Sequence, residues 1–187
     1  MHDLEPFFLW RSKYLANRDT RSPFFEYENS EVYYTDAIYN HVIHPQWDFF
    51  GSDTLYMKQL YADYERGFTI LEFIGEWNDL LSNDCMILYR DIIEAMIEEG
   101  IDKFILIGEN VFNFHADIPD YYQEWWENIP DGFIASIGWR PHVLDEWHQY
   151  GLTHYFRPLE GFENWRTAGP LTLYQAVESS VWGKRLR

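Results

Sequence analysis

Three segments decide the fold: FTILEFIG (residues 68–75), FILIG (residues 104–108) and FIASIG (residues 133–138). Each is a run of residues that favour β-strands, and each ends in Ile-Gly with polar residues immediately after it. The Ile-Gly pairs begin at residues 74, 107 and 137, and such a spacing is about the length of one βαβ unit. We therefore predict parallel strands whose carboxyl ends meet at one edge of a sheet, where open α/β sheets bind their ligands.

The flanking segments predict the other elements of such a sheet. Residues 54–64 are rich in β-formers and precede a turn, which predicts an antiparallel hairpin with the first Ile-Gly strand. Apolar residues at helical spacing then predict a helix that ends before Gly100; they include Cys85, Leu88, Ile92 and Met96. A further helix is expected at residues 31–42, with Ser30 as N-cap. Three more helices are expected at residues 119–127, 141–150 and 171–182. A last strand is expected at residues 153–156 and a loop at residues 157–170.

Length and composition favour one α/β domain over residues 1–187. A chain of 187 residues fits a single domain, and an apolar content of 47% supplies a sizeable core. We expect a single-layer, mostly parallel sheet that is flanked by helices and opened by an antiparallel hairpin. Residues 1–50 are then a helical or irregular N-terminal extension packed on this domain.

A hairpin followed by alternating helices and strands resembles the arrangement in STAS-type anti-sigma-factor antagonists. The resemblance lies in the order of elements alone. The phosphorylatable serine motif of that family has no counterpart in residues 108–113, which read GENVFN. The resemblance therefore implies an alternative description of the same fold, and it carries no functional residue to this chain.

Charge and cysteine content restrict the partners. The 31 acidic residues outnumber the 14 basic ones, which gives a net charge of −17. Such a surface repels nucleic-acid backbones and anionic membranes, so we expect neither as a partner, and instead a protein or a small molecule. Cys85 is the only cysteine, which excludes an intramolecular disulfide. With neither a signal-peptide pattern nor a membrane-spanning run, we expect a cytoplasmic protein.

Functional side chains follow each Ile-Gly pair. If the strands are neighbours, Glu76 and Glu109 occupy equivalent positions, with carboxylates about 5–10 Å apart. Glycoside hydrolases use carboxylates at such separations, which makes this pair a catalytic candidate with His115 or Arg140 assisting. Candidate ligand-binding residues from the same loops are Trp77, Asn78, Asp79, Asn110, Asn113, Trp139, Arg140 and His142.

A structural explanation competes with the catalytic one. Glu76 and Asp79 suit the N-terminus of a following helix, while Asn110 and Asn113 suit a turn. The sequence contains no Gly-x-Ser-x-Gly elbow, dinucleotide fingerprint or P-loop, so we expect no cofactor. A His-x-x-His pair at residues 41–44 lacks the further ligands of a closed zinc site, so we expect no metal.

The segment at residues 117–131 contains five acidic residues and no basic one, with Tyr121, Tyr122, Trp125 and Trp126 interleaved. Neighbouring rings do not all fit one inward stripe, so at least one ring is expected near the surface. Interfaces favour Tyr and Trp, although packing under the loop at residues 157–170 explains these rings equally well. The leading hypothesis is a non-enzymatic module that binds a protein or small ligand, and the alternative is a hydrolase.

Overall fold

A five-stranded mixed sheet forms the centre of the computed structural model, which describes residues 2–30, 32–34 and 37–183. The strand order is β4-β5-β6-β7-β8. The first pair is antiparallel and the remaining pairs are parallel, which confirms the predicted α/β fold. The strands are β4 (Leu55–Asp63), β5 (Phe68–Asn78), β6 (Lys103–His115), β7 (Phe133–Ile137) and β8 (Arg157–Leu159).

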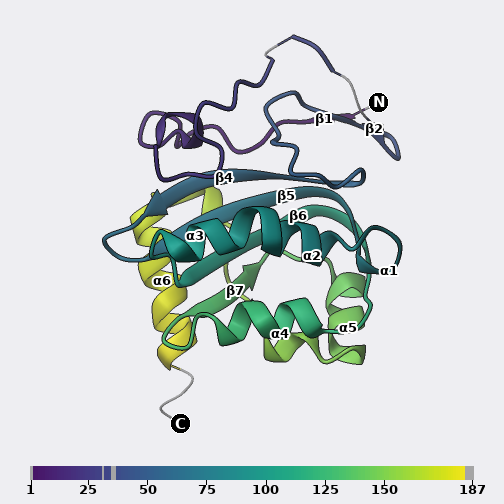
Figure 1. Cartoon of the computed structure of the whole chain (residues 1–187), viewed down its shortest axis with the longest axis vertical. Coiled ribbons are helices and arrows are strands. Elements are labelled where there is room, and N and C mark those ends of the chain that lie inside the picture. Colours follow the sequence, from purple (N-terminus) through teal and green to yellow (C-terminus); the bar gives the residue numbers. More distant parts are fainter. Residues whose placement is uncertain (1, 31, 35–36, 184–187) are drawn as a thin grey trace.

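Helices cover both faces of this sheet. Figure 1 shows α2, α3 and α4 on one face, while α6 lies on the other. The predicted helix over Cys85 to Met96 is one continuous helix with a π-helical middle segment, η2 (Tyr89–Ile93), between α2 and α3. The α-helices are α1 (Asp79–Ser82), α2 (Asp84–Leu88), α3 (Glu94–Glu98), α4 (Asp120–Glu127), α5 (Pro141–Gln149) and α6 (Pro170–Gly183). The 3-10 helices are η1 (Ala16–Arg18), η3 (Leu152–His154) and η4 (Trp165–Thr167).

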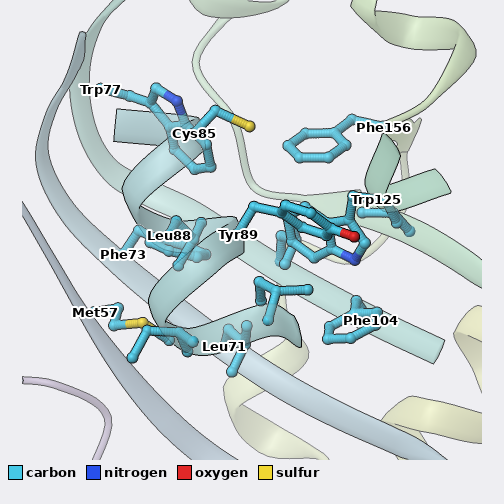
Figure 2. Close-up of a cluster of buried hydrophobic side chains, with 14 of the residues drawn as sticks. Met57, Leu71, Phe73, Trp77, Cys85, Leu88, Tyr89, Phe104, Trp125 and Phe156 are labelled. Atoms are coloured by element: carbon cyan, nitrogen blue, oxygen red, sulfur yellow. The ribbon is translucent and has the colours of Figure 1, made fainter. Parts of the chain in front are cut away.

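The larger core lies between the sheet and helices α2 to α5, and Figure 2 shows part of it. Trp125 of α4 is fully buried, with its ring centroid 5.0 Å from that of Phe104 on β6 and 5.2 Å from that of Phe156. Tyr122 is buried too, whereas Trp126 is 38% exposed. This confirms that one ring of the aromatic segment lies at the surface. Burial of each such side chain stabilises the fold by about 1.5–3 kcal/mol.

The opposite face of the sheet has two separate covers. Helix α6 packs over one part, where Tyr174 stacks on Phe68 with ring centroids 4.0 Å apart. A small sheet of order β1-β3-β2 packs over the other part, against Tyr56 and Ile74. Its strands are β1 (His2–Leu4), β2 (Ala37–Ile38) and β3 (His41–Ile43). Glu72 faces the junction of these two covers, because it alternates with Ile70 under the first and Ile74 under the second.

Two predicted elements are wrong. The helix expected at residues 31–42 is replaced by β2 and β3, although residues 31, 35 and 36 lie outside the described part. The Ser30 hydroxyl does accept hydrogen bonds from the backbone N–H groups of Val32 and Tyr33, at 3.1 and 3.0 Å, so the capping residue closes a local turn instead of starting a helix. The strand expected at residues 153–156 is also wrong, because η3 ends at His154, a turn follows, and β8 begins at Arg157 within the expected loop.

Strands β5 and β6 run past their Ile-Gly pairs, whereas β7 ends at its pair. At Gly75 the backbone φ is +122°, and an added Cβ atom would lie 2.1 Å from the carbonyl oxygen of Thr54. A residue with a side chain would be strained there, and glycine lets β5 continue past its Ile-Gly pair. The residues after the first two pairs are therefore strand residues and not loop residues.

The indole of Trp139 packs directly on the backbone of Gly108 in β6. A side chain at residue 108 would therefore clash with it. A Cβ atom there would lie 2.2 Å from the Trp139 Cδ2 atom. We expect Gly108→Ala to lower the free energy of unfolding by about 1–3 kcal/mol through overpacking, measured by urea denaturation. Gly183→Ala is the control, since nothing lies within 4 Å of its added Cβ atom, and it should change stability by less than about 0.5 kcal/mol. Equal stability of the two variants would contradict this packing.

Candidate functional site

The pairing of β5 with β6 separates Glu76 from Glu109. The register shifts twice beyond Glu72, and each shift places an extra residue in β6. Before the shifts Glu72 pairs with Ile107, and after them Glu76 pairs with Asn113. The prediction that Glu76 and Glu109 occupy equivalent positions is therefore wrong. Asn110 also lies within the strand, opposite Ile74, and not in a turn.

Glu76 gathers several of the predicted residues around it. Its Oε1 atom accepts a hydrogen bond from Asn78 Nδ2 at 3.0 Å and lies 3.6 Å from His115 Nε2. The Tyr39 hydroxyl donates to its Oε2 atom, and this bond is the main cause that raises the pKa of Tyr39. Asn113 Nδ2 lies 3.0 Å from His115 Nε2. Glu76, His115, Asn78 and Asn113 thus form one polar cluster on the two extended strands.

Trp77, Asn78 and Asp79 tie the end of β5 to the helices that follow. Asn78 Oδ1 accepts from the Leu81 backbone N–H at 2.9 Å and so caps α1. Asp79 Oδ1 accepts from Trp77 Nε1 at 3.0 Å and from the Cys85 backbone N–H at 2.9 Å. Burial raises the pKa of Asp79 to about 6. For Asp79, these contacts agree with the expected structural role at the N-terminus of a following helix.

Glu109 belongs to a different group. Its Oε1 atom accepts from Trp165 Nε1 at 2.8 Å, and Arg166 donates to its Oε2 atom. A second nitrogen of the same guanidinium lies 3.7 Å from Glu72 Oε1. Glu72 Oε2 accepts from the Phe7 backbone N–H at 2.8 Å. Arg166 therefore bridges a carboxylate pair, Glu72 and Glu109, in the middle of β5 and β6.

Glu72 is the member of this pair that sequence reasoning missed. It is 1% exposed, and burial raises its pKa to about 7. The Phe7 N–H and Arg166 lower this pKa, and Glu109 raises it slightly. The sequence does contain a signal for Glu72, which is the one charged residue in the apolar run at residues 68–75. A charged residue within a strand that is apolar on both faces requires a partner. Its partner Arg166 comes from a segment that was expected to be a loop.

A cavity of about 350 Å³ opens at the carboxyl ends of β7 and β8, beside Glu109 in the middle of β6. We call it the strand-end cavity. Two predicted residues, Glu109 and Trp139, line it. The other lining residues are Ser136, Gly138, Leu144, Pro158, Leu159, Glu160, Phe162 and Glu163. The cavity thus lies at the end of the third Ile-Gly strand and beside the middle of the second.

Ser136 is the unusual polar residue of this lining. It is 1% exposed, and its Oγ atom makes no hydrogen bond with the described residues. Leaving a buried hydroxyl unpaired costs about 1–3 kcal/mol, so such a group in a cavity wall is suited to pair with a ligand.

Arg140 and His142 lie beside the cavity lining, along β6. Arg140 Nε donates to the Glu109 carbonyl oxygen at 3.3 Å, and its guanidinium carbon lies 5.1 Å from the centroid of the Phe112 ring. His142 Nε2 lies 2.9 Å from the Phe112 carbonyl oxygen. These contacts hold the start of α5 against β6. They therefore fix the position of Trp139, which precedes α5 and lines the cavity.

Across the described residues, no group of three or more His, Cys, Asp or Glu side chains is arranged to hold a metal ion. Likewise, within those residues, no helix is both long and apolar enough to cross a membrane. No protein-family model matches the sequence, and a search of curated proteins finds no significant similarity.

Ionisation of Glu72 makes the stability of the protein depend on pH. The folded state keeps this proton up to about pH 7, whereas the unfolded chain loses it near the ordinary value of 4.5. The free energy of unfolding therefore falls as the pH rises between these values, by about 3 kcal/mol for this group alone. Glu72→Gln cannot ionise and retains an acceptor for the Phe7 N–H.

We expect the stability of Glu72→Gln relative to the wild type to increase by about 3 kcal/mol from pH 4.5 to pH 8, measured by urea denaturation at each pH. Taking the difference removes the contribution of other groups that titrate in this range, such as Asp79. A difference that stays constant across the range would show that Glu72 ionises normally.

Proposed function

We propose that this chain is a non-enzymatic ligand-binding domain that holds a small organic cation in the strand-end cavity. The observation that carries the proposal is the buried, unpaired Ser136 hydroxyl in a wall whose charged residues are all acidic. The expected cytoplasmic location is part of this proposal.

Charge favours a cationic ligand. The cavity is lined by Glu109, Glu160 and Glu163, and by no basic residue among those described. Arg166 forms an ion pair with Glu109 and so neutralises its negative charge. The negative charges of Glu160 and Glu163 then favour a cationic ligand. The net charge of −17 also raises the local concentration of cations around the protein.

The size and rigidity of the cavity suit a small molecule. A volume of about 350 Å³ lies within the range of about 300–1,000 Å³ for small-molecule sites. The Trp139 indole is held by its Nε1–H bond to the Leu106 carbonyl at 3.2 Å and by the Trp147 ring at 4.6 Å between centroids. Aromatic faces attract ammonium and guanidinium groups, so Trp139 and Phe162 complement the carboxylates.

The hydrolase alternative gains no support from these contacts. An acid–nucleophile pair must reach a substrate from both sides of the bond that breaks. Glu72 is buried at the junction of the two covers, and both oxygens of Glu109 are bound by Trp165 and Arg166. Glu76, the other member of the predicted pair, is engaged by Tyr39 and Asn78.

Calorimetric titration with agmatine, putrescine and choline tests the proposal, because these probes present guanidinium, primary ammonium and quaternary ammonium groups. We expect saturable binding of at least one probe, and a Kd about fivefold to tenfold higher in Ser136→Ala, since one hydrogen bond is worth about 1 kcal/mol. The variant should be at least as stable as the wild type, because it loses an unpaired buried hydroxyl.

Ser179→Ala is the matched control, since this serine is exposed on α6, and it should leave the affinity unchanged. Glu160→Gln combined with Glu163→Gln should weaken binding further. If none of the three probes binds, or if Ser136→Ala binds as tightly as the wild type, the proposed site is wrong. Binding of a Lys- or Arg-containing partner protein in place of the free probes would likewise overturn the small-ligand proposal.

A further inference from the structure

We infer that a second cavity, between the N-terminal segment and the edge strand β4, binds a small aromatic anion. This cavity has a volume of about 440 Å³, and we call it the N-terminal cavity. It shares no lining residue with the strand-end cavity. The inference therefore does not depend on the function proposed above.

The charge of this lining is opposite to that of the whole chain. The charged residues in its wall are Arg11, Arg18 and Lys58, with Glu28 as the acidic one. The chain as a whole has a net charge of −17. A local basic group in such an acidic protein offers an anion a favourable place to bind, which the rest of the surface does not.

Arg18 is the basic side chain that is available to a ligand. Lys58 is committed to the buried carboxylate of Asp48, with Nζ 3.0 Å from Oδ1. Arg11 pairs with Glu5 at 3.2 Å. Arg18, at the end of η1, makes no ion pair or side-chain hydrogen bond with the described residues. A guanidinium binds a carboxylate or phosphate through two parallel hydrogen bonds.

Aromatic side chains supply the remaining walls. Trp10 is 4% exposed, and its Nε1–H donates to the Ala168 carbonyl at 3.1 Å. Phe7 packs edge-on against it, with ring centroids 5.1 Å apart. Tyr14 is fixed by its hydroxyl bond to Asp19 at 2.8 Å. The hydrogen bonds of Trp10 and Tyr14 and the packing of Phe7 on Trp10 fix these rings, so this part of the wall is preorganised for a planar ligand.

A ring with an attached anionic group fits both features of the N-terminal cavity. The ring contacts Phe7, Trp10 and Tyr14, and the anionic group pairs with Arg18. The shared chemistry is an aromatic ring joined to a carboxylate or a phosphate. Two probes separate these sources: indole-3-acetate carries a carboxylate, and adenosine monophosphate carries a phosphate.

The test is a calorimetric titration of the full chain at low ionic strength. We expect saturable binding of indole-3-acetate or adenosine monophosphate. The neutral analogue of each, indole-3-acetamide or adenosine, should bind about tenfold more weakly, because a hydrogen bond to a charged group contributes about 1.5–3 kcal/mol. Arg18→Gln should raise the Kd of the anion by a similar factor and leave that of the neutral analogue unchanged. Arg18→Lys should retain part of the affinity.

Arg66→Gln is the matched control, since Arg66 lies in the turn between β4 and β5, is paired with Asp63 and does not line the cavity. It should bind the anion as the wild type does. Thermal unfolding confirms that Arg18→Gln is folded. The inference is overturned if neither anion binds, if acid and neutral analogue bind equally, or if Arg18→Gln has no effect. Loss of anion binding in Ser136→Ala would place the anion in the strand-end cavity and would overturn it too.

Discussion

The hydrogen-bond register between β5 and β6 is the constraint on which the rest of the structure depends. The two strands pair in parallel from Phe68 and Lys103 to Asn78 and His115, with two shifts in between. In a strand, a displacement of one residue sends a side chain to the opposite face of the sheet. The two shifts therefore decide which polar groups meet: Glu109 faces Glu72 through Arg166, and Glu76 faces Asn113 and His115.

This register also explains why a buried carboxyl group is tolerated in the middle of β5. Glu72 faces the junction between the α6 cover and the small N-terminal sheet, because it lies between Ile70 under the first and Ile74 under the second. The Phe7 backbone and Arg166 reach it there from opposite ends of the chain. Removing one partner of a buried ion pair usually destabilises the fold strongly, because the other partner is left as an unpaired buried charge. The N-terminal segment, η4 and the central sheet are thus held together at one point.

The sequence predicted correctly that the three Ile-Gly strands run parallel, because their apolar runs and spacing are local features. It did not predict the order of the strands in the sheet. The register shifts were beyond its reach, since periodicity reports which face a residue occupies and not which residue it pairs with. Ser30 illustrates a second limit: its capping bonds to Val32 and Tyr33 form, yet β3 pairs with β1 and so forms a strand in place of a helix. Tertiary pairing outweighed local propensity there. The contribution of Arg166 to the site depends on a contact across the chain, which no local pattern encodes.

The most direct measurement of the register is disulfide formation between engineered cysteine pairs on β5 and β6. Cysteines that form a disulfide have Cα atoms about 4.4–6.8 Å apart, and neighbouring strands are separated by about 4.8 Å. The structure pairs Glu76 with Asn113, so Glu76→Cys with Asn113→Cys should cross-link on mild oxidation, as read by mass spectrometry of non-reduced peptides. Glu76→Cys with Glu109→Cys should stay reduced. A cross-link in the second variant and none in the first would contradict the account.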